Sequence, residues 1–383
     1  MTSLKWLLSC LTLVGIYYLL LAQNWLQKSG QINDLDGLAL KYGVPEDELN
    51  EAQAKYNIEK LKPFIKNLST WNNRSDFLTR QLIKQLDFDT KYKVSDGALL
   101  ISKSNDFKEY SVANVVVTEK SEFLASGNLY YPSKPSKYPL IMSPHDHSDQ
   151  GRFDKAVQIR CAALAKLGAI VFTWDMIGWG ESGGDHETEN VKSLQLKIAS
   201  KILSIFLNSE YINESKIGYT GSSGGAALGM NLLAMDNRFH AAALVSMISS
   251  LSVGNCHCEI AGFHYQTSNY QTNNIELTGL IAPRPLLLVS NGRDWTRAFP
   301  KLDLPFLNSI YALYGATKVL MNSHFALEGH DFGPSKRAAV YEFFSQQFNL
   351  PSKNSEELEK FVSIKLRKDL EARPYDPLRR TIY

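Results

Sequence analysis

The sequence has 383 residues, of which 44% are hydrophobic, and its 41 basic and 39 acidic side chains give a formal net charge of +2. A chain of this length and apolar content can bury the core of one large globular domain with additional segments. Because the charge is nearly balanced, the composition gives no electrostatic basis for binding nucleic acid, and no nucleic-acid partner is expected.

The N-terminal segment is apolar and follows a single basic residue. Lys5 precedes an uncharged run over residues 6–22, which is long for a signal-peptide core and slightly short for a membrane-spanning helix. We interpret residues 1–22 as a signal peptide or a signal anchor. The expected location is therefore exported: periplasmic, outer-surface or secreted, with a membrane tether through residues 5–22 if the segment is not cleaved.

Residues 23–105 are predicted to form a mostly helical N-terminal extension. Val44 to Leu49 combines a proline with acidic residues, as is typical of a first helical turn, and residues 71–86 show the spacing of an amphipathic helix. The extension carries no pattern that indicates chemistry, and we expect it to pack against the main domain.

From residue 106 to residue 350 the sequence alternates between strand-like and helix-like segments. Residues 110–117 and 124–131 predict a β-hairpin. Later strands are expected at 138–143, 169–174, 216–220, 241–246, 285–290 and 318–321, and helices at 153–166, 191–207, 226–234 and 335–348. This alternation predicts an α/β fold with a mainly parallel sheet covered by helices on both faces. The charged tail, residues 351–383, is expected on the surface.

The glycine-rich stretch Gly221 to Gly225 lies between a predicted strand and a predicted helix. It fits the pattern G-x-S-x-G with Ser223 at the centre, which is typical of a sharp turn that presents a nucleophilic serine. A phosphate-binding loop would need a lysine that is missing here, and the dinucleotide pattern G-x-G-x-x-G is not matched. The sequence therefore predicts Ser223 as a nucleophile, with helical N–H groups beside it for a developing oxyanion.

A serine nucleophile needs a base, and the base needs an orienting acid. In this class of fold the chain order is serine, acid, histidine, each near the C-terminal end of a strand. Asp294 follows the strand at 285–290 and His330 follows the strand at 318–321, in that order. His324 is a rival base, but it lies directly after its strand, whereas His330 sits in a glycine-flanked loop that can reach across the sheet edge.

The second oxyanion donor is expected in the loop of residues 143–152. The predicted donors are the backbone N–H groups of Gly224 and of His147 or Asp146. Candidates for lining the substrate cleft are side chains in the surrounding loops, namely His145, Trp179 and Trp295.

Two of the four cysteines, Cys256 and Cys258, form a C-x-C motif. A metal site would need further ligands, which His257, Glu259 and His264 could supply. Because no four-ligand spacing pattern is present, we favour a structural thiol pair or a disulfide, and no metal is expected. Cys161 is predicted to occupy a core position of a helix.

Together these motifs resemble those of the α/β-hydrolase superfamily, and within it of acetyl-xylan-esterase-like, dienelactone-hydrolase-related proteins. The similarity runs from about Trp71 to Phe348 and rests on the segments at 175–182, 220–225, 256–259, 281–288, 294–296 and 310–316, and on His330. The resemblance implies Ser223 as nucleophile, Asp294 as acid and His330 as base, with no metal or organic cofactor.

One position departs from the family pattern. The family usually has His-Gly-His in the oxyanion loop, whereas this chain has His145-Asp146-His147. Glycine permits backbone angles that aspartate adopts only at a cost, and a carboxylate near an oxyanion is unfavourable unless it points away. The departure predicts reduced activity or a shifted substrate.

The function expected from these observations is that of a serine esterase working through an acyl-enzyme. The expected substrate is an acetyl or similar short-acyl ester on a polysaccharide or its fragments. Aromatic residues between 263 and 270 could stack on sugars or pack as a lid, and both interpretations stay open. The alternatives are a peptidase of the prolyl-oligopeptidase type, although the large N-terminal domain of that class is missing, and a catalytically dead module used for binding.

Overall fold

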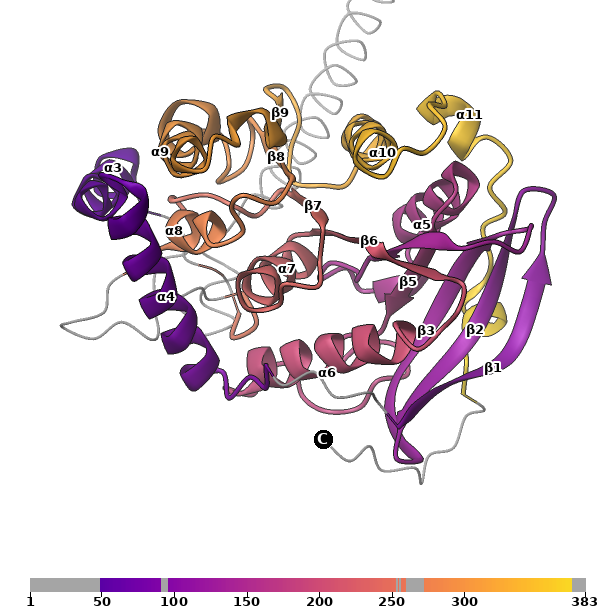
Figure 1. Ribbon diagram of the computed structural model, residues 1–383. Helices are drawn as coiled ribbons and strands as arrows, with labels where there is room; N and C mark the ends of the chain where they lie inside the picture. The colour runs from indigo at the N-terminus through magenta and orange to yellow at the C-terminus, as the bar shows by residue number, and fades with distance from the viewer. Residues whose placement is uncertain (1–48, 91–95, 253, 255, 260–271, 374–383) are drawn as a thin grey trace, which may run out of the picture. The chain divides into compact units, whose positions relative to one another are not determined.

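The computed structural model describes residues 49–90, 96–252, 254, 256–259 and 272–373 (Figure 1). The chain divides into two units, Met1–Asp47 and Glu48–Tyr383, and only the second contains described residues. The predicted targeting segment, residues 44–48 of the predicted helix start and the aromatic stretch 263–270 lie outside the described residues. Among the described helices, each is too short or too polar to cross a lipid bilayer.

The fold is built on a nine-stranded sheet with the order β1-β2-β3-β5-β4-β6-β7-β8-β9. In this order, the pairs β1–β2, β2–β3 and β3–β5 are antiparallel. The remaining pairs, from β5–β4 to β8–β9, are parallel. The predicted mainly parallel sheet and the predicted hairpin are confirmed. The strands are β1 (Gly97–Asp106), β2 (Tyr110–Glu119), β3 (Glu122–Pro132), β4 (Tyr138–Met142), β5 (Ile170–Trp174), β6 (Ile212–Ser222), β7 (Ala241–Val245), β8 (Leu286–Asn291) and β9 (Leu320–Phe325).

Helices cover both faces of the sheet. Figure 1 shows α5 (Lys155–Leu167) and α10 (Pro334–Phe348) on one face, and α6 (Val191–Phe206) and α7 (Gly224–Met235) on the other. Strands β5 and β7 are buried along their whole length, as the covering of both faces requires. Their runs of apolar and β-branched residues are therefore continuous rather than alternating, which is why the strands could be predicted from the sequence.

The strand β1 was predicted incorrectly as part of the helical extension. It pairs along its length with β2 at the edge of the sheet. Most of its side chains are exposed, so hydrophobic alternation, the usual sign of a strand, is weak there. Two helices that had not been predicted, α8 (Asn274–Gly279) and α9 (Phe299–Leu313), lie beside β8 and β9 in the chain.

The described part of the N-terminal extension is helical and packs on the main domain. It contains α3 (Glu51–Leu61), the short η1 (Lys62–Ile65) and α4 (Leu68–Gln85), and the last of these confirms the predicted amphipathic helix. Arg74 of α4 donates two hydrogen bonds to Glu276 of α8, at 2.8 and 2.7 Å, and both side chains are buried. Moving α4 away would leave the Glu276 carboxylate buried without its cation, which is unfavourable. This ion pair therefore holds the extension on the main domain.

The described part of the C-terminal segment, residues 351–373, lies on the surface of the domain with most of its side chains exposed or partly exposed, and a few buried contacts hold it there. The segment forms α11 (Ser355–Glu359) and α12 (Arg367–Leu370), and Leu358 and Leu370 are buried. The side-chain amides of Asn114 and Asn128, on β2 and β3, donate to backbone carbonyls of residues 369–371. Charged side chains of this segment also make contacts with the domain: the Glu359 carboxylate accepts hydrogen bonds from Arg337 and Tyr341 of α10.

Candidate active site

The turn that carries Ser223 is a strained connection between β6 and α7. Ser223 has φ 51° and ψ −125°, a conformation that L-residues rarely adopt. The chain folds so tightly that a Cβ on Gly221 would lie 2.6 Å from the carbonyl carbon of Gly225. The backbone N–H of Ser223 donates to the carbonyl of Val245 at 3.1 Å, which fixes the turn to the neighbouring strand β7.

Asp294 and His330 are joined by a hydrogen bond. The Nδ1 atom of His330 lies 3.2 Å from Oδ2 of Asp294, whose side chain is buried while that of His330 is 31% exposed. The carboxylate also accepts hydrogen bonds from Asn291 and from the backbone N–H of Thr296, both at 2.7 Å. Burial alone would raise the pKa of Asp294, but the bonds from His330, Thr296 and Asn291 outweigh it and leave the pKa lowered.

A hydrogen bond connects the loop that carries His330 to the residue after β7, the strand that neighbours β6 and the serine turn. The hydroxyl of Ser246, directly after β7, donates to the carbonyl of Asp331 at 3.1 Å and accepts from the Asn291 amide at 2.8 Å. The ring of Trp295 lies 4.3 Å from the ring of His330 and supports it from the side. The strand order β6-β7-β8-β9 thus places Ser223, Asp294 and His330 along one edge of the sheet.

The serine hydroxyl, however, is bonded to a different residue. Ser223 Oγ donates to Oε1 of Glu259 at 3.2 Å, and within the described part of the chain no hydrogen bond joins it to His330. Glu259 is 2% exposed, and the same oxygen lies 3.1 Å from Nδ1 of His147. Glu259 had been considered only as a metal ligand. Its position one residue after the C-x-C motif gave no sign that it would face the nucleophile.

Behind Glu259, two cysteines and two histidines gather from three loops. His147 follows β4, His186 follows β5, and Cys256 and Cys258 follow β7. Their four ligand atoms all lie within 4.8 Å of one another, and both cysteines are free thiols. His147 and His186 were missed because both are more than 65 residues from the C-x-C motif in the chain.

The buried surroundings shift the pKa values of this group. Burial alone would lower the pKa of His147, but the negative charge of Glu259 and a hydrogen bond with Cys256 hold it well above its usual range. The hydrogen bond from Cys258 lowers the pKa of Cys256, whereas burial raises that of Cys258. The thiol of Cys256 therefore loses its proton more easily than the thiol of Cys258.

Asp146, in the predicted oxyanion loop of residues 143–152, does not adopt the backbone conformation that favours glycine. Asp146 is absent from the residues with positive φ, so the expected conformational cost does not arise. Its carboxylate accepts a hydrogen bond from the backbone N–H of Ser148 at 3.2 Å and is thereby engaged within its own loop. A Cβ on Gly224 would lie 2.4 Å from Nε2 of His147, so the glycine lets the loop approach the serine turn.

The predicted cleft residues take three different positions. His145 is fully buried; its Nδ1 bonds the carbonyl of Asp146 and its Nε2 accepts from the N–H of Met176. Both ring nitrogens are used, so the expectation that His145 lines the cleft is corrected to a loop-holding role. Trp179 is half-buried and stacks on His147 at 5.3 Å, and Trp295 is buried against His330.

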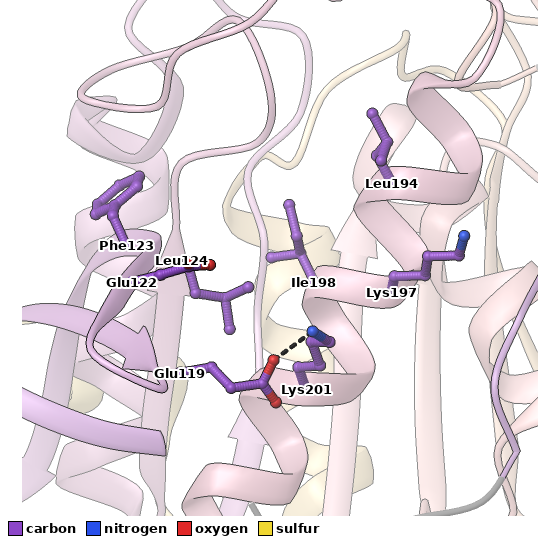
Figure 2. Close-up of a pocket in the computed structure, with 8 residues that line it drawn as sticks. All are labelled: Glu119, Glu122, Phe123, Leu124, Leu194, Lys197, Ile198 and Lys201. Atoms are coloured by element: carbon purple, nitrogen blue, oxygen red, sulfur yellow. Dashed lines mark hydrogen bonds and ion pairs between the residues drawn. The ribbon is translucent and has the colours of Figure 1, made fainter. Parts of the chain in front are cut away.

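Figure 2 shows a hollow of about 280 Å³ between the β2–β3 turn and α6. It is lined by charged and apolar side chains, including an ion pair between Lys201 and Glu119. None of its lining residues belongs to the site around Ser223, so its position does not identify the substrate cleft.

Comparison with known proteins was made by sequence and by structure. No family model matches the sequence, and no curated protein matches it. Among solved structures, methylesterase BT1017 is 32% identical, with a TM-score of 0.78 over 85% of this chain and 74% of that one. A candidate acetyl xylan esterase from Bacteroides fragilis (13% identity, TM-score 0.54, 68% of this chain and 76% of that one) shares the fold. A CE15 glucuronoyl esterase from Teredinibacter turnerae also shares the fold (14% identity, TM-score 0.57, 82% of this chain and 99% of that one).

Proposed function

Because the chain belongs to the α/β-hydrolase-type esterases, we propose that it is a serine esterase that hydrolyses carboxylic esters on carbohydrates. The observation that carries this proposal is the strained Ser223 turn placed on the same sheet edge as the hydrogen-bonded Asp294–His330 pair. A serine in such a turn presents its hydroxyl at the C-terminal ends of the parallel strands, and an oriented histidine can take its proton.

In the proposed reaction, Ser223 Oγ attacks the ester carbonyl carbon and His330 takes the hydroxyl proton at Nε2. Asp294 holds the imidazole by its Nδ1 and stabilises the positive charge that develops. The N–H of Gly224, the first residue of α7, has no partner within the helix and is a donor for the oxyanion, with the N–H of His147 or Asp146 as the second. The alcohol leaves with the proton from His330, and water, activated by the same histidine, releases the acid.

The Ser223–Glu259 bond sets a condition on this mechanism. The hydroxyl must turn from Glu259 toward His330 before it can attack, because a bond to a buried carboxylate does not place its proton on the base. The hydroxyl of a serine moves from one staggered position to another by rotation about χ1, at a small cost in free energy. Glu259 therefore holds the resting hydroxyl, and His330 engages it when substrate is bound.

Two ester types fit an esterase of carbohydrates. The sequence resemblance favours an acetyl ester, in which the acetyl group forms the acyl-enzyme and the sugar leaves. The structure with 32% identity is called a methylesterase, which favours a methyl ester of a sugar acid. In that case the sugar acid forms the acyl-enzyme and methanol leaves. The two types place the sugar on opposite sides of Ser223, so product analysis separates them.

The test uses the full-length chain with Ser223→Ala and, as a matched control from the same turn, Ser222→Ala. We expect wild type and Ser222→Ala to hydrolyse p-nitrophenyl acetate and to react with a fluorophosphonate, and Ser223→Ala to do neither. Acetylated and methyl-esterified polysaccharides are then compared for the release of acetate and methanol. A wild-type protein that is neither active nor labelled would favour the dead binding module, and cleavage of aminoacyl amides in preference to esters would favour the peptidase.

A further inference from the structure

The four ligand atoms of His147, His186, Cys256 and Cys258 form a compact set of two nitrogens and two sulfurs. Three of the four residues are buried, and the fourth, His147, is partly covered by the stacked ring of Trp179. Two thiolates with two imidazoles are a ligand set that zinc takes in closed, four-coordinate structural sites.

The distances within the cluster come close to those of a tetrahedral site. The Nε2 atom of His147 lies 3.1 Å from the sulfur of Cys258 and 3.9 Å from that of Cys256, and Nε2 of His186 lies 3.6 Å from Cys256. Zinc bonds of about 2.3 Å to sulfur and 2.0–2.1 Å to nitrogen require nitrogen–sulfur separations of about 3.5 Å. The two sulfurs are 2.8 Å apart and would have to separate by about 1 Å to reach the tetrahedral value.

Both histidines are held in the orientation that metal binding through Nε2 requires. Nδ1 of His147 lies 3.1 Å from the Glu259 carboxylate, and Nδ1 of His186 lies 3.1 Å from the carbonyl of Ile177. The amide of Gln195 lies 3.3 Å from the same Nδ1 of His186. Metal-bound histidines typically donate their second N–H to a carboxylate or a backbone carbonyl, which leaves the other nitrogen for the metal.

We propose that His147, His186, Cys256 and Cys258 bind a structural zinc ion beside the nucleophile turn. Binding would release to solvent the protons that the two sulfurs and Nε2 of His147 carry, so that two thiolates balance the charge of the ion and both imidazoles are neutral. The site would join segments that follow β4, β5 and β7 in the chain. Through the His147–Glu259–Ser223 bonds it would position the resting serine hydroxyl, and it departs from the expectation of no metal.

The test measures zinc in the full-length protein purified without chelators and dialysed against zinc-containing and then metal-free buffer. We expect about one zinc per chain in wild type and in Ser223→Ala, so that metal content is independent of the esterase activity. Cys256→Ser and Cys258→Ser should lose the metal. His257→Ala, which changes the residue between the two cysteines but not a proposed ligand, should keep it.

A second measurement covers the case in which the cysteine variants fail to fold. Wild type and His257→Ala refolded with cobalt should both show thiolate-to-cobalt absorption and the visible bands of tetrahedral cobalt. Wild-type protein without zinc and without cobalt absorption would overturn the proposal. A denatured, unreduced chain that is two hydrogen atoms lighter than its sequence mass, with Cys256 and Cys258 resistant to alkylation, would also overturn it in favour of a disulfide.

Discussion

The two sides of Ser223 differ in burial and in chemistry. On one side, His330 is partly exposed and its hydrogen-bonded carboxyl partner, Asp294, has a lowered pKa. On the other side, Glu259 and the thiol pair are packed away from water, the ring of His147 is partly buried, and the serine hydroxyl donates a hydrogen bond to Glu259. A base must exchange protons with substrate and water, whereas a buried cluster can only hold its neighbours in place. In the mechanism that we propose, proton transfer therefore belongs to the His330 side and positioning of the hydroxyl to the Glu259 side.

The largest expected effect comes from removing the base. His330→Ala should lower kcat/KM for p-nitrophenyl acetate by about 10³–10⁴-fold, because it removes the imidazole that takes the serine proton in the proposed mechanism. Glu259→Gln should cost only about 10-fold, since the amide oxygen can still accept the resting hydrogen bond. A larger loss in Glu259→Gln than in His330→Ala would reverse the assignment of the two sides.

Removing the orienting acid should have the next largest effect. Asp294→Asn should lower kcat by about 10²–10³-fold with little change in KM, since the amide cannot stabilise the imidazolium. The lowered folded-state pKa of Asp294 means that its carboxylate stabilises the fold above its unfolded pKa and loses this contribution as pH falls through the folded value. The variant should therefore unfold at lower denaturant concentration than wild type at pH 7, and the difference should narrow as the pH falls below about 4, as measured by equilibrium unfolding.

A buried carboxyl group elsewhere in the domain, that of Asp303 on α9, has the opposite pKa shift. Burial raises the pKa of Asp303 to about 6, although Ser249 and Ser250 donate hydrogen bonds to it. The unfolded chain loses this proton near pH 4, so the wild-type free energy of unfolding should fall between pH 4 and pH 6 by up to about 3 kcal/mol. Asp303→Asn should remove that part of the pH dependence, whereas Asp76→Asn, at an exposed site, should retain it. A pH profile unchanged in Asp303→Asn would contradict the raised pKa.

The smallest effect is expected from removing the hydrogen bonds of Ser246, one of which connects to the loop that carries His330. Ser246→Ala removes the bond to the Asp331 carbonyl and the acceptor of the Asn291 amide. We expect a stability loss of about 1 kcal/mol and a several-fold lower kcat at unchanged KM, because His330 would be held less firmly. Ser323→Ala, on β9 at the same sheet edge, is the control and should change neither quantity. Equal effects of the two variants would show that Ser246 has no special role.

Local pattern was sufficient for most of the fold and for the candidate catalytic residues. Continuous apolar runs indicated the buried parallel strands, and tiny residues around Ser223 indicated the turn, because these features depend on neighbours close in the chain. The order of Ser223, Asp294 and His330 after successive strands followed from the same rule. The edge strand β1 was not predicted, since most of its side chains are exposed and the alternation of buried and exposed residues along it is weak.

Only the tertiary structure brought together the residues on the buried side of the serine. Cys256 and Cys258 are close in the sequence, but His147 and His186 come from loops after two other strands, and no spacing rule connects them. The sequence likewise gave no sign that Glu259 would accept the Ser223 hydrogen bond or that Asp146 would bond its own loop. Such contacts depend on how the loops after different strands pack together at the C-terminal ends of those strands. Long-range packing decides this arrangement, and local sequence pattern does not.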